Sequence, residues 1–273
     1  MAKTKILFIT HEMSPFLEIS KISEITRQLP QAMQEKGFEI RILMPRFGNI
    51  NERRNRLHEV IRLSGMNIVV DNNDNPLIIK VASLPAARMQ VYFLDNEEYF
   101  QRKKVFRDES GKFFNDNNER SLFFGKGVLE TVKKLGWSPD VVHCHGWFSA
   151  MVPLYLKKVY HEDPTFKDAK VFYSLYKEDF GADTLSAKYG EMPAQEDVDV
   201  QDSAAYGSGN YVDLYKGALT YTDVAVINDS ELNAEVLQFI EDQKIRVFKP
   251  NGDDDYESFS TLYEEFAPEE IEA

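Results

Sequence analysis

The sequence predicts a doubly wound α/β domain with a mostly parallel sheet, helices on both faces and a small β-rich excursion at one edge. Two patterns support this prediction. Short, continuous apolar runs recur along the chain, and such runs are typical of strands buried on both faces of a parallel sheet. Segments with apolar residues at helical spacing separate them, as in α/β folds. The 273 residues are enough to bury a substantial core.

The first unit of this pattern spans 5–45. "KILFIT" at 5–10 is a continuous apolar strand, and the apolar residues after it recur at helical spacing up to Gly37, a residue type that often follows a helix C-terminus. Pro30 interrupts this segment, so we expect a kink or two short helices. "FEIRILMP" at 38–45 is the second strand, and a strand–helix–strand unit of this length implies parallel strands.

The pattern changes between 57 and 95 and then resumes. "NIVVDNNDNPLIIKV" predicts two strands around a polar turn, and "MQVYFLDN" adds another strand at the sheet edge. Further on we expect strands at 140–145, 169–176 and 223–228. Helices are predicted at 117–135, in "WFSAMVPLYLKKVY", in "VDLYKGALTYT" and in "SELNAEVLQFI". The polar stretch 177–210 is the best candidate for a mobile loop.

The chain divides into a Rossmann-like domain at 1–251 and an acidic C-terminal tail at 252–273. Four aromatic or apolar residues of the tail keep a helical spacing: Phe259, Leu262, Tyr263 and Phe266. A merely solvated tail has no need of such a face, so we predict a short helix at 256–266 docked on the domain.

Composition excludes several classes of function. The formal net charge of −13 disfavours binding to nucleic acid, which needs a basic face, and docking on anionic lipid. The single cysteine, Cys144, excludes an intramolecular disulfide and fits a reducing compartment. The apolar run near the N-terminus is too short for a signal peptide, and no run reaches membrane-spanning length. We therefore expect a cytoplasmic protein.

Glycine-rich phosphate motifs are absent from this sequence. No GxGxxG follows the first strand, there is no GxxxxGK[ST], and "GSG" at 207–209 stands alone in a polar segment. No serine lies in a GxSxG elbow. The acidic runs "EDVDVQD" and "DDDYES" are best interpreted as solvated surface. We accordingly expect no cofactor and none of the common nucleotide-binding or hydrolase chemistries.

"VVHCHGWF" at 141–148 is the most suggestive local cluster. Alternation along a strand sends His143 and His145 to one face and Cys144 to the other, at the carboxyl end where α/β sheets bind ligands. A hydrogen-bonded structural pair is the favoured interpretation, because the sequence nominates no third or fourth metal ligand. Nothing marks Cys144 as an activated nucleophile. In "FFNDNNERSLFF", Asp116, Asn117 and Asn118 are possible helix N-caps.

Several segments, in order along nearly the whole chain, resemble the N-terminal domain of bacterial glycogen synthases and plant starch synthases, glycosyltransferases of the two-domain GT-B fold. "KILFITHEMSPF" resembles the family's "KILFVASEVAPF", and "LPQAMQEKGFEIRILMPRFGNI" resembles "LPKALAKRGHEVRVVLPRYGDI". "DNNERSLFFGKGVLETVKKLGWSPDVVHCHGW" follows "DNxERFxFFxxAxLE…LGWxPDxVHCHDWH", and "LYKGALTYTDVAVIN" is similar to "FLKAGIxYADxVTTVSP". By this resemblance, the ligand-binding residues would be Asp116, Asn117, Arg120, His143, His145 and Trp147.

The first loop departs from the family pattern. There the family reads KTGGL, whose lysine meets the sugar-nucleotide diphosphate and whose glycines let backbone approach the donor. The corresponding positions here are a degenerate donor loop: Glu18, Ile19, Ser20, Lys21 and Ile22. A carboxylate in place of an ammonium turns attraction for a diphosphate into repulsion. Lys21 is too weak a substitute to rescue the loop, since both glycines are gone as well.

Two later motifs also depart. The family's DWH is Gly146, Trp147 and Phe148, and its THN is Ser174, Leu175 and Tyr176. The chain also stops where the link to a second, donor-binding domain begins in the family, and we expect that domain to be missing.

Three functions follow from the resemblance. The favoured one is a catalytically incompetent relative that retains binding of α-glucan, such as a maltooligosaccharide, or of a separate protein. The first alternative is one subunit of a split glucosyltransferase that uses ADP- or UDP-glucose. The second is a structural or regulatory interaction protein without carbohydrate affinity.

Overall fold

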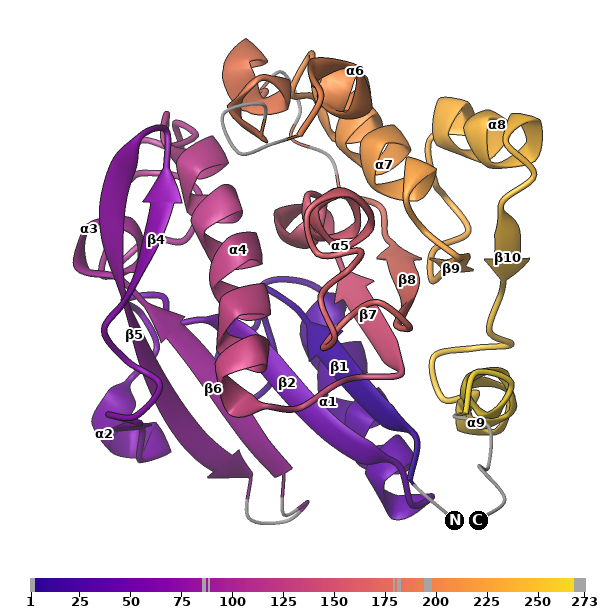
Figure 1. Ribbon diagram of the computed structural model, residues 1–273, viewed down its shortest axis with the longest axis horizontal. Helices are drawn as coiled ribbons and strands as arrows, with labels where there is room; N and C mark the ends of the chain where they lie inside the picture. The colour runs from indigo at the N-terminus through magenta and orange to yellow at the C-terminus, as the bar shows by residue number, and fades with distance from the viewer. Residues whose placement is uncertain are drawn as a thin grey trace.

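A computed structural model of the chain describes residues 3–84, 87, 89–178, 180, 183–193 and 198–267. Across these residues a single large sheet has the strand order β10-β9-β8-β7-β1-β2-β6-β5-β3, with β4 paired to β5 outside that order. Its helices lie on both faces (Figure 1). The strands are β1 (Lys5–Ile9), β2 (Glu39–Pro45), β3 (His58–Glu59), β4 (Met66–Val70), β5 (Asn73–Leu84), β6 (Met89–Asp95), β7 (Val141–His145), β8 (Lys170–Leu175), β9 (Val224–Ile227) and β10 (Arg246–Phe248).

The sheet is mostly parallel, as the sequence predicts. β1 pairs in parallel with β2 and β7, and parallel pairing continues through β8 and β9 to β10 and from β2 to β6. Only β5 pairs antiparallel, with β3, β4 and β6. All five residues of β7 are buried, as are four of the five in β1. This two-sided burial explains why neither strand carries an acidic residue and why β1 is apolar after Lys5.

The helices account for most of the predicted helical segments. They are α1 (Ile22–Glu35), α2 (Glu52–Asn55), α3 (Glu97–Phe100), α4 (Asn117–Leu135), α5 (Val152–Lys158), α6 (Val200–Ser203), α7 (Tyr211–Thr220), α8 (Ala234–Asp242) and α9 (Tyr256–Glu264). Short 3₁₀ turns are η1 (Trp147–Ser149), η2 (Ala187–Gly190) and η4 (Ala204–Tyr206).

Of the two outcomes expected at Pro30, a kink or two short helices, the second is wrong. One helix, α1, runs through the proline, which is buried on the face that also carries Leu29 and Met33. A proline removes only one backbone donor, and the packing of this apolar face compensates for that loss. The helix ends as predicted at a glycine: Gly37 has φ +99° and donates its N–H to the Gln34 carbonyl.

The segment at 177–210 contains more regular structure than the sequence analysis expected. It includes η2, α6 and η4, and several of its side chains are buried, among them Leu185, Tyr189 and Tyr206. Residues 179, 181–182 and 194–197 of this segment lie outside the described residues, so the prediction of a mobile loop is not tested there.

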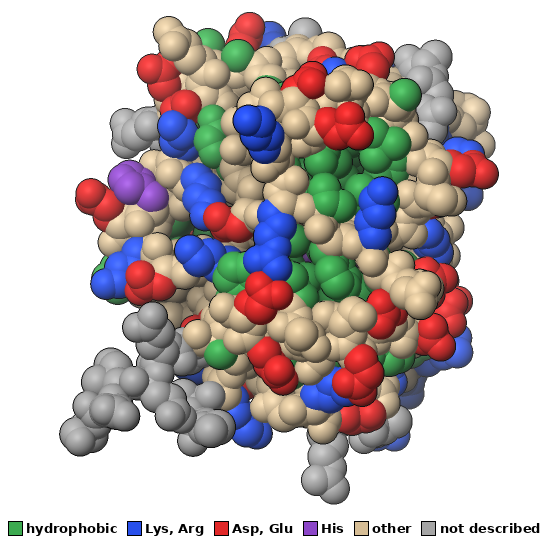
Figure 2. Space-filling model, turned by 90° about the vertical axis from the view of Figure 1, so that its right-hand side faces the viewer, with side chains coloured by type: hydrophobic (Ala, Val, Ile, Leu, Met, Phe, Trp, Pro, Cys, Tyr) green, Lys and Arg blue, Asp and Glu red, His purple; other side chains and the backbone are tan. Residues whose placement is uncertain are grey.

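The acidic tail contributes helix α9, which packs against α1 and the sheet. Phe259, Leu262 and Tyr263 are buried, whereas Glu257 is exposed. The Tyr263 ring stacks on Phe172 of β8 with centroids 5.5 Å apart. Figure 2 shows the side of the molecule on which α8, β10 and α9 lie in Figure 1: hydrophobic side chains are visible there between Lys and Arg side chains, with Asp and Glu gathered below.

Candidate functional site

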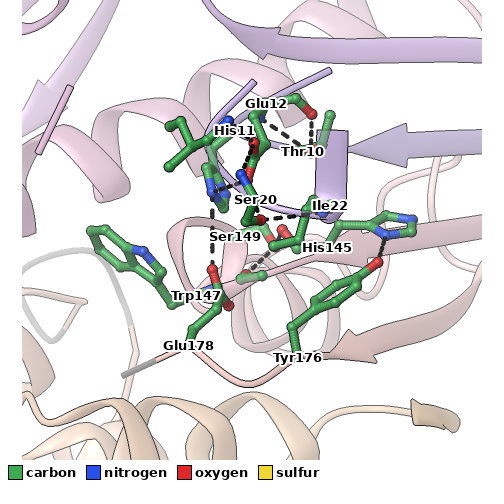
Figure 3. A network of polar contacts seen from close by, with 12 residues as sticks. Thr10, His11, Glu12, Ser20, Ile22, His145, Trp147, Ser149, Tyr176 and Glu178 are labelled. Carbon is green, nitrogen blue, oxygen red and sulfur yellow. Dashed lines mark hydrogen bonds and ion pairs between the residues drawn. The ribbon is translucent and has the colours of Figure 1, made fainter. Parts of the chain in front are cut away.

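The candidate site lies where the loops after β1, β7 and β8 meet (Figure 3). His11 and Glu12 follow β1, Gly146 and Trp147 follow β7, and Glu178 follows β8. Because these strands are parallel neighbours, their carboxyl ends share one edge of the sheet, which is where α/β folds bind ligands.

His143 and His145 lie side by side, with ring centroids 4.2 Å apart. His143 Nδ1 is 2.6 Å from the Tyr263 hydroxyl, and its Nε2 is 2.8 Å from Ser174 Oγ. His145 Nδ1 is 2.7 Å from the Tyr176 hydroxyl. Both rings are fully buried. The pair is therefore hydrogen-bonded to the fold, and His143 ties β7 to α9.

Burial keeps both histidines neutral. It lowers the pKa of His143 well below the usual range, with a smaller contribution from His145. It lowers the pKa of His145 to about 3, helped by the nearby charge of His11. Among the described residues, no group of three or more His, Cys, Asp or Glu side chains could hold a metal ion. Burial also raises the pKa of the Cys144 thiol, which keeps it protonated.

The first loop is held by its own side chains. The Glu12 carboxylate accepts hydrogen bonds from the backbone N–H of Ile19 at 2.6 Å and of Ser20 at 2.8 Å, and from Ser20 Oγ at 2.6 Å. Glu18 is exposed and accepts a hydrogen bond from Ser14 Oγ at 2.7 Å. The loop therefore presents a carboxylate and an apolar side chain, Ile19, which is 50% exposed.

Lys21 binds the segment after β9. Its Nζ donates to the Asn228 carbonyl at 2.6 Å and lies 3.2 Å from Asp229 Oδ2. The one lysine among residues 18–22 is thus bound at the carboxyl end of β9.

His11 is enclosed by two carboxylates. Its Nε2 lies 3.5 Å from Glu12 Oε1 and 3.9 Å from Glu178 Oε1. Burial opposes a charge on this ring, but the hydrogen bond and charge of Glu12, together with the charge of Glu178, outweigh it and raise the pKa of His11. Burial would raise the pKa of Glu12, but the contacts with His11 and the hydrogen bonds from Ser20 lower it.

Glu178 completes the cluster from the loop after β8. Its Oε2 accepts hydrogen bonds from the Trp147 backbone N–H at 2.9 Å and from the Tyr215 hydroxyl. Burial raises the pKa of Glu178, although His11, Tyr215 and Trp147 act in the opposite direction. Sequence reasoning missed this residue, because a lone glutamate in a polar segment gives no signal. It also missed His11, which a comparison with the serine of "KILFVASEVAPF" could have found.

Trp147 is buried in an aromatic cluster. Its ring lies 4.8 Å from Phe106, 5.0 Å from Phe180 and 6.0 Å from Phe113, centroid to centroid. Phe148, which replaces the imidazole of the family's DWH, is only 1% exposed. At this position, the side chain contributes to the hydrophobic core and offers no polar group to a ligand.

The residues at the start of α4 bind one another and the nearby backbone. Asp116 is the N-cap residue of α4 but makes no capping hydrogen bond with its side chain; it accepts one from Arg102 Nη1 at 2.7 Å instead. Asn117 Oδ1 accepts a hydrogen bond from Arg120 Nη1 at 2.6 Å. Arg120 is fully buried, and that burial lowers its pKa to about 10. Each of these three residues is thus engaged in contacts within the fold.

A cavity of about 470 Å³ opens between 112–115 and 183–186. Its walls combine apolar and polar side chains: Lys112, Phe113, Phe114, Asn115, Asp183, Thr184, Leu185 and Ser186. Arg107 connects the two walls through an ion pair with Asp183 and a 3.0 Å hydrogen bond to the Gly111 carbonyl. This volume is within the range of small-molecule sites, about 300–1,000 Å³.

The comparisons with known proteins identify the family. The model of the starch synthase catalytic domain matches residues 5–245. The chain belongs to the starch synthase catalytic domain family. A glycogen synthase of Chlorobium limicola is 40% identical over 216 residues, which are 78% of this chain and 43% of that protein. One of Pelodictyon phaeoclathratiforme is 42% identical over 173 residues, which are 63% and 35% of the two chains.

The motif resemblance is thereby confirmed, and so is the fold. The solved catalytic domain of starch synthase IV from Arabidopsis thaliana, bound to ADP and acarbose, matches 91% of this chain and 51% of its own. The TM-score is 0.74 at 17% identity. The chain spans less than half the length of the glycogen synthases just described. In the part that the structure describes, no helix is both long and apolar enough to cross a membrane.

Proposed function

We propose that this starch synthase-related domain binds α-glucan and does not itself transfer glucose. The main evidence against glucose transfer comes from the first loop. It presents the Glu18 carboxylate at the position of the family's lysine, while its only lysine, Lys21, is bound to Asn228 and Asp229. A sugar-nucleotide diphosphate would meet repulsion there and would have to compete with Asp229 for the ammonium.

A second departure supports the same conclusion. Phe148 stands where the family pattern has the histidine of DWH, and it is buried among other rings 5.3 Å from Phe106 and 5.5 Å from Phe124. His145 is nearby but is neutral and bonded to Tyr176. Phe148 offers no hydrogen bond in place of the lost imidazole, and the His145 ring, whose Nε2 has no partner, is fully buried.

The cavity between 112–115 and 183–186 is the proposed glucan site. The ring of Phe114 is partly exposed, and such rings stack on the apolar faces of sugars. Asn115, Thr184 and Ser186 supply donors and acceptors for sugar hydroxyls. Both kinds of contact are needed for a neutral polyol, and neither favours a charged ligand.

Calorimetric titration with maltohexaose tests this proposal. We expect saturable binding to the unmodified chain and weaker binding for Phe114→Ala and Asn115→Ala. Asn67→Ala, on an exposed position of β4, is the matched control and should bind as the unmodified chain does. Equal affinity in all four proteins would place the glucan elsewhere, and the absence of any heat of binding would reject glucan recognition altogether. We further propose a cytoplasmic location, supported by the single cysteine, which is free and buried.

A further inference from the structure

A cradle of hydrogen-bond donors at the carboxyl edge of the sheet is filled by a carboxylate of the chain itself. Two hydrogen-bond donors belong to it, the Trp147 N–H after β7 and the Tyr215 hydroxyl on α7. The His11 ring after β1 lies beside them, with Nε2 3.9 Å from Glu178 Oε1. All three groups converge on Glu178, and Figure 3 shows its contact with His11. A positive ring and two neutral donors around one carboxylate are the usual components of an anion site.

Gly146 creates the space for this carboxylate. It has φ +71°, a conformation that side chains rarely adopt. A Cβ added there would lie 2.8 Å from His11 Cε1 and 3.0 Å from Glu178 Oε1. The cradle therefore exists only with glycine at this position.

Two residues of the cradle depart from the family pattern. His11 replaces the serine of "KILFVASEVAPF", and Gly146 replaces the aspartate of DWH. Glu12, whose carboxylate lies 3.5 Å from His11 Nε2, matches that pattern. The two departures thus meet at the Glu178 carboxylate. The Glu178 side chain is 12% exposed, so the cradle is open to solvent on one side.

We propose that His11, the Trp147 N–H and the Tyr215 hydroxyl form an anion-binding site for a small carboxylate, with Glu178 as its resident ligand. An external carboxylate takes the place of Glu178 without changing the net charge beside His11. When Glu178 occupies the cradle, it connects the end of β8 to the loops after β1 and β7. This inference does not depend on glucan binding.

Glu178→Ala with formate as the probe tests the site. The variant is expected to melt at a lower temperature than the unmodified chain and to recover part of the loss, saturably, in formate. Chloride at equal ionic strength should give no such recovery. Glu231→Ala, which removes an exposed carboxylate paired with Lys177, is the matched control and should show no response specific to formate. A Glu178→Ala protein that responds equally to formate and chloride would overturn the proposal.

Glu178→Gln provides a second test that does not create a void. The amide fills the cradle, so formate should have no specific effect on this variant. Loss of the carboxylate charge should also lower the pKa of the His11 ring, measured by NMR, relative to the unmodified chain. An unchanged His11 titration would show that Glu178 does not act as an anion on this ring, and would contradict the proposal. Tyr215→Phe in the Glu178→Ala background should weaken the formate response.

Discussion

The buried histidine pair should make the protein sensitive to mild acid. His143 and His145 are neutral in the folded state because burial lowers the pKa of each ring. In the unfolded chain both regain an ordinary pKa near 6.5. Below that pH, the unfolded state binds two more protons than the folded state at these positions, so the free energy of unfolding falls as the pH falls.

The magnitude follows from proton linkage. When the pH falls from 7.5 to 5.0, one histidine that stays neutral in the folded state lowers the free energy of unfolding by about 2 kcal/mol. The pair lowers it by about 4 kcal/mol. His11 acts in the opposite direction, because its raised pKa makes the folded state take up its proton before the unfolded chain does as the pH falls. Glu178 acts in the same direction as His11, because its raised pKa favours the folded state as it becomes protonated at lower pH. About 4 kcal/mol is a large part of the stability of a typical domain.

Urea unfolding at a series of pH values from 7.5 to 5.0 measures this slope. His145→Gln removes one titrating group but keeps an acceptor for the Tyr176 hydroxyl, so the variant should lose about half as much stability over this range. His161→Gln, at an exposed position, is the control and should keep the full slope. A free energy of unfolding that stays flat down to pH 5.0, or an unchanged slope in His145→Gln, would refute the reasoning.

Further predictions concern the glycine cradle, α9 and the first loop. Gly146→Ala should lower the free energy of unfolding in urea by about 1–3 kcal/mol, because the added Cβ strains the backbone and collides with His11. An unchanged urea midpoint would contradict this. Tyr263→Phe leaves His143 Nδ1 without its partner and should cost about 1–3 kcal/mol. Truncation after Asn251 removes α9, so the melting temperature should fall and self-association should rise; an unchanged monomer would make the tail only a solubilising extension. Glu18→Lys should not produce glucose transfer in a labelled-glucose assay, since Phe148 remains.

Much of the fold could be predicted because burial leaves a direct record in the sequence. β1 is buried almost throughout and appears as an apolar run after Lys5. The helix predicted at 117–135 coincides with α4. Pro30 misled the prediction, because a local propensity says nothing about the packing that holds α1 together.

The site was harder to predict, because its contacts join residues far apart in the chain. Glu178 meets His11 only because β1 and β8 both lie beside β7 in the sheet. A sequence pattern marks Gly146 as a departure but does not reveal the carboxylate that occupies the space it leaves. Arg120 matches a family motif, yet only the structure shows that it donates to the Tyr99 and Val105 carbonyls, both at 2.7 Å.

The central claim, glucan binding without transfer, is tested most directly by one incorporation assay. The chain is incubated with glycogen and either ADP-glucose or UDP-glucose carrying labelled glucose, at a protein concentration at which calorimetry shows bound maltohexaose. We predict no incorporation above a protein-free control with either donor. Incorporation that rises with protein concentration and is abolished by His145→Ala would contradict the account.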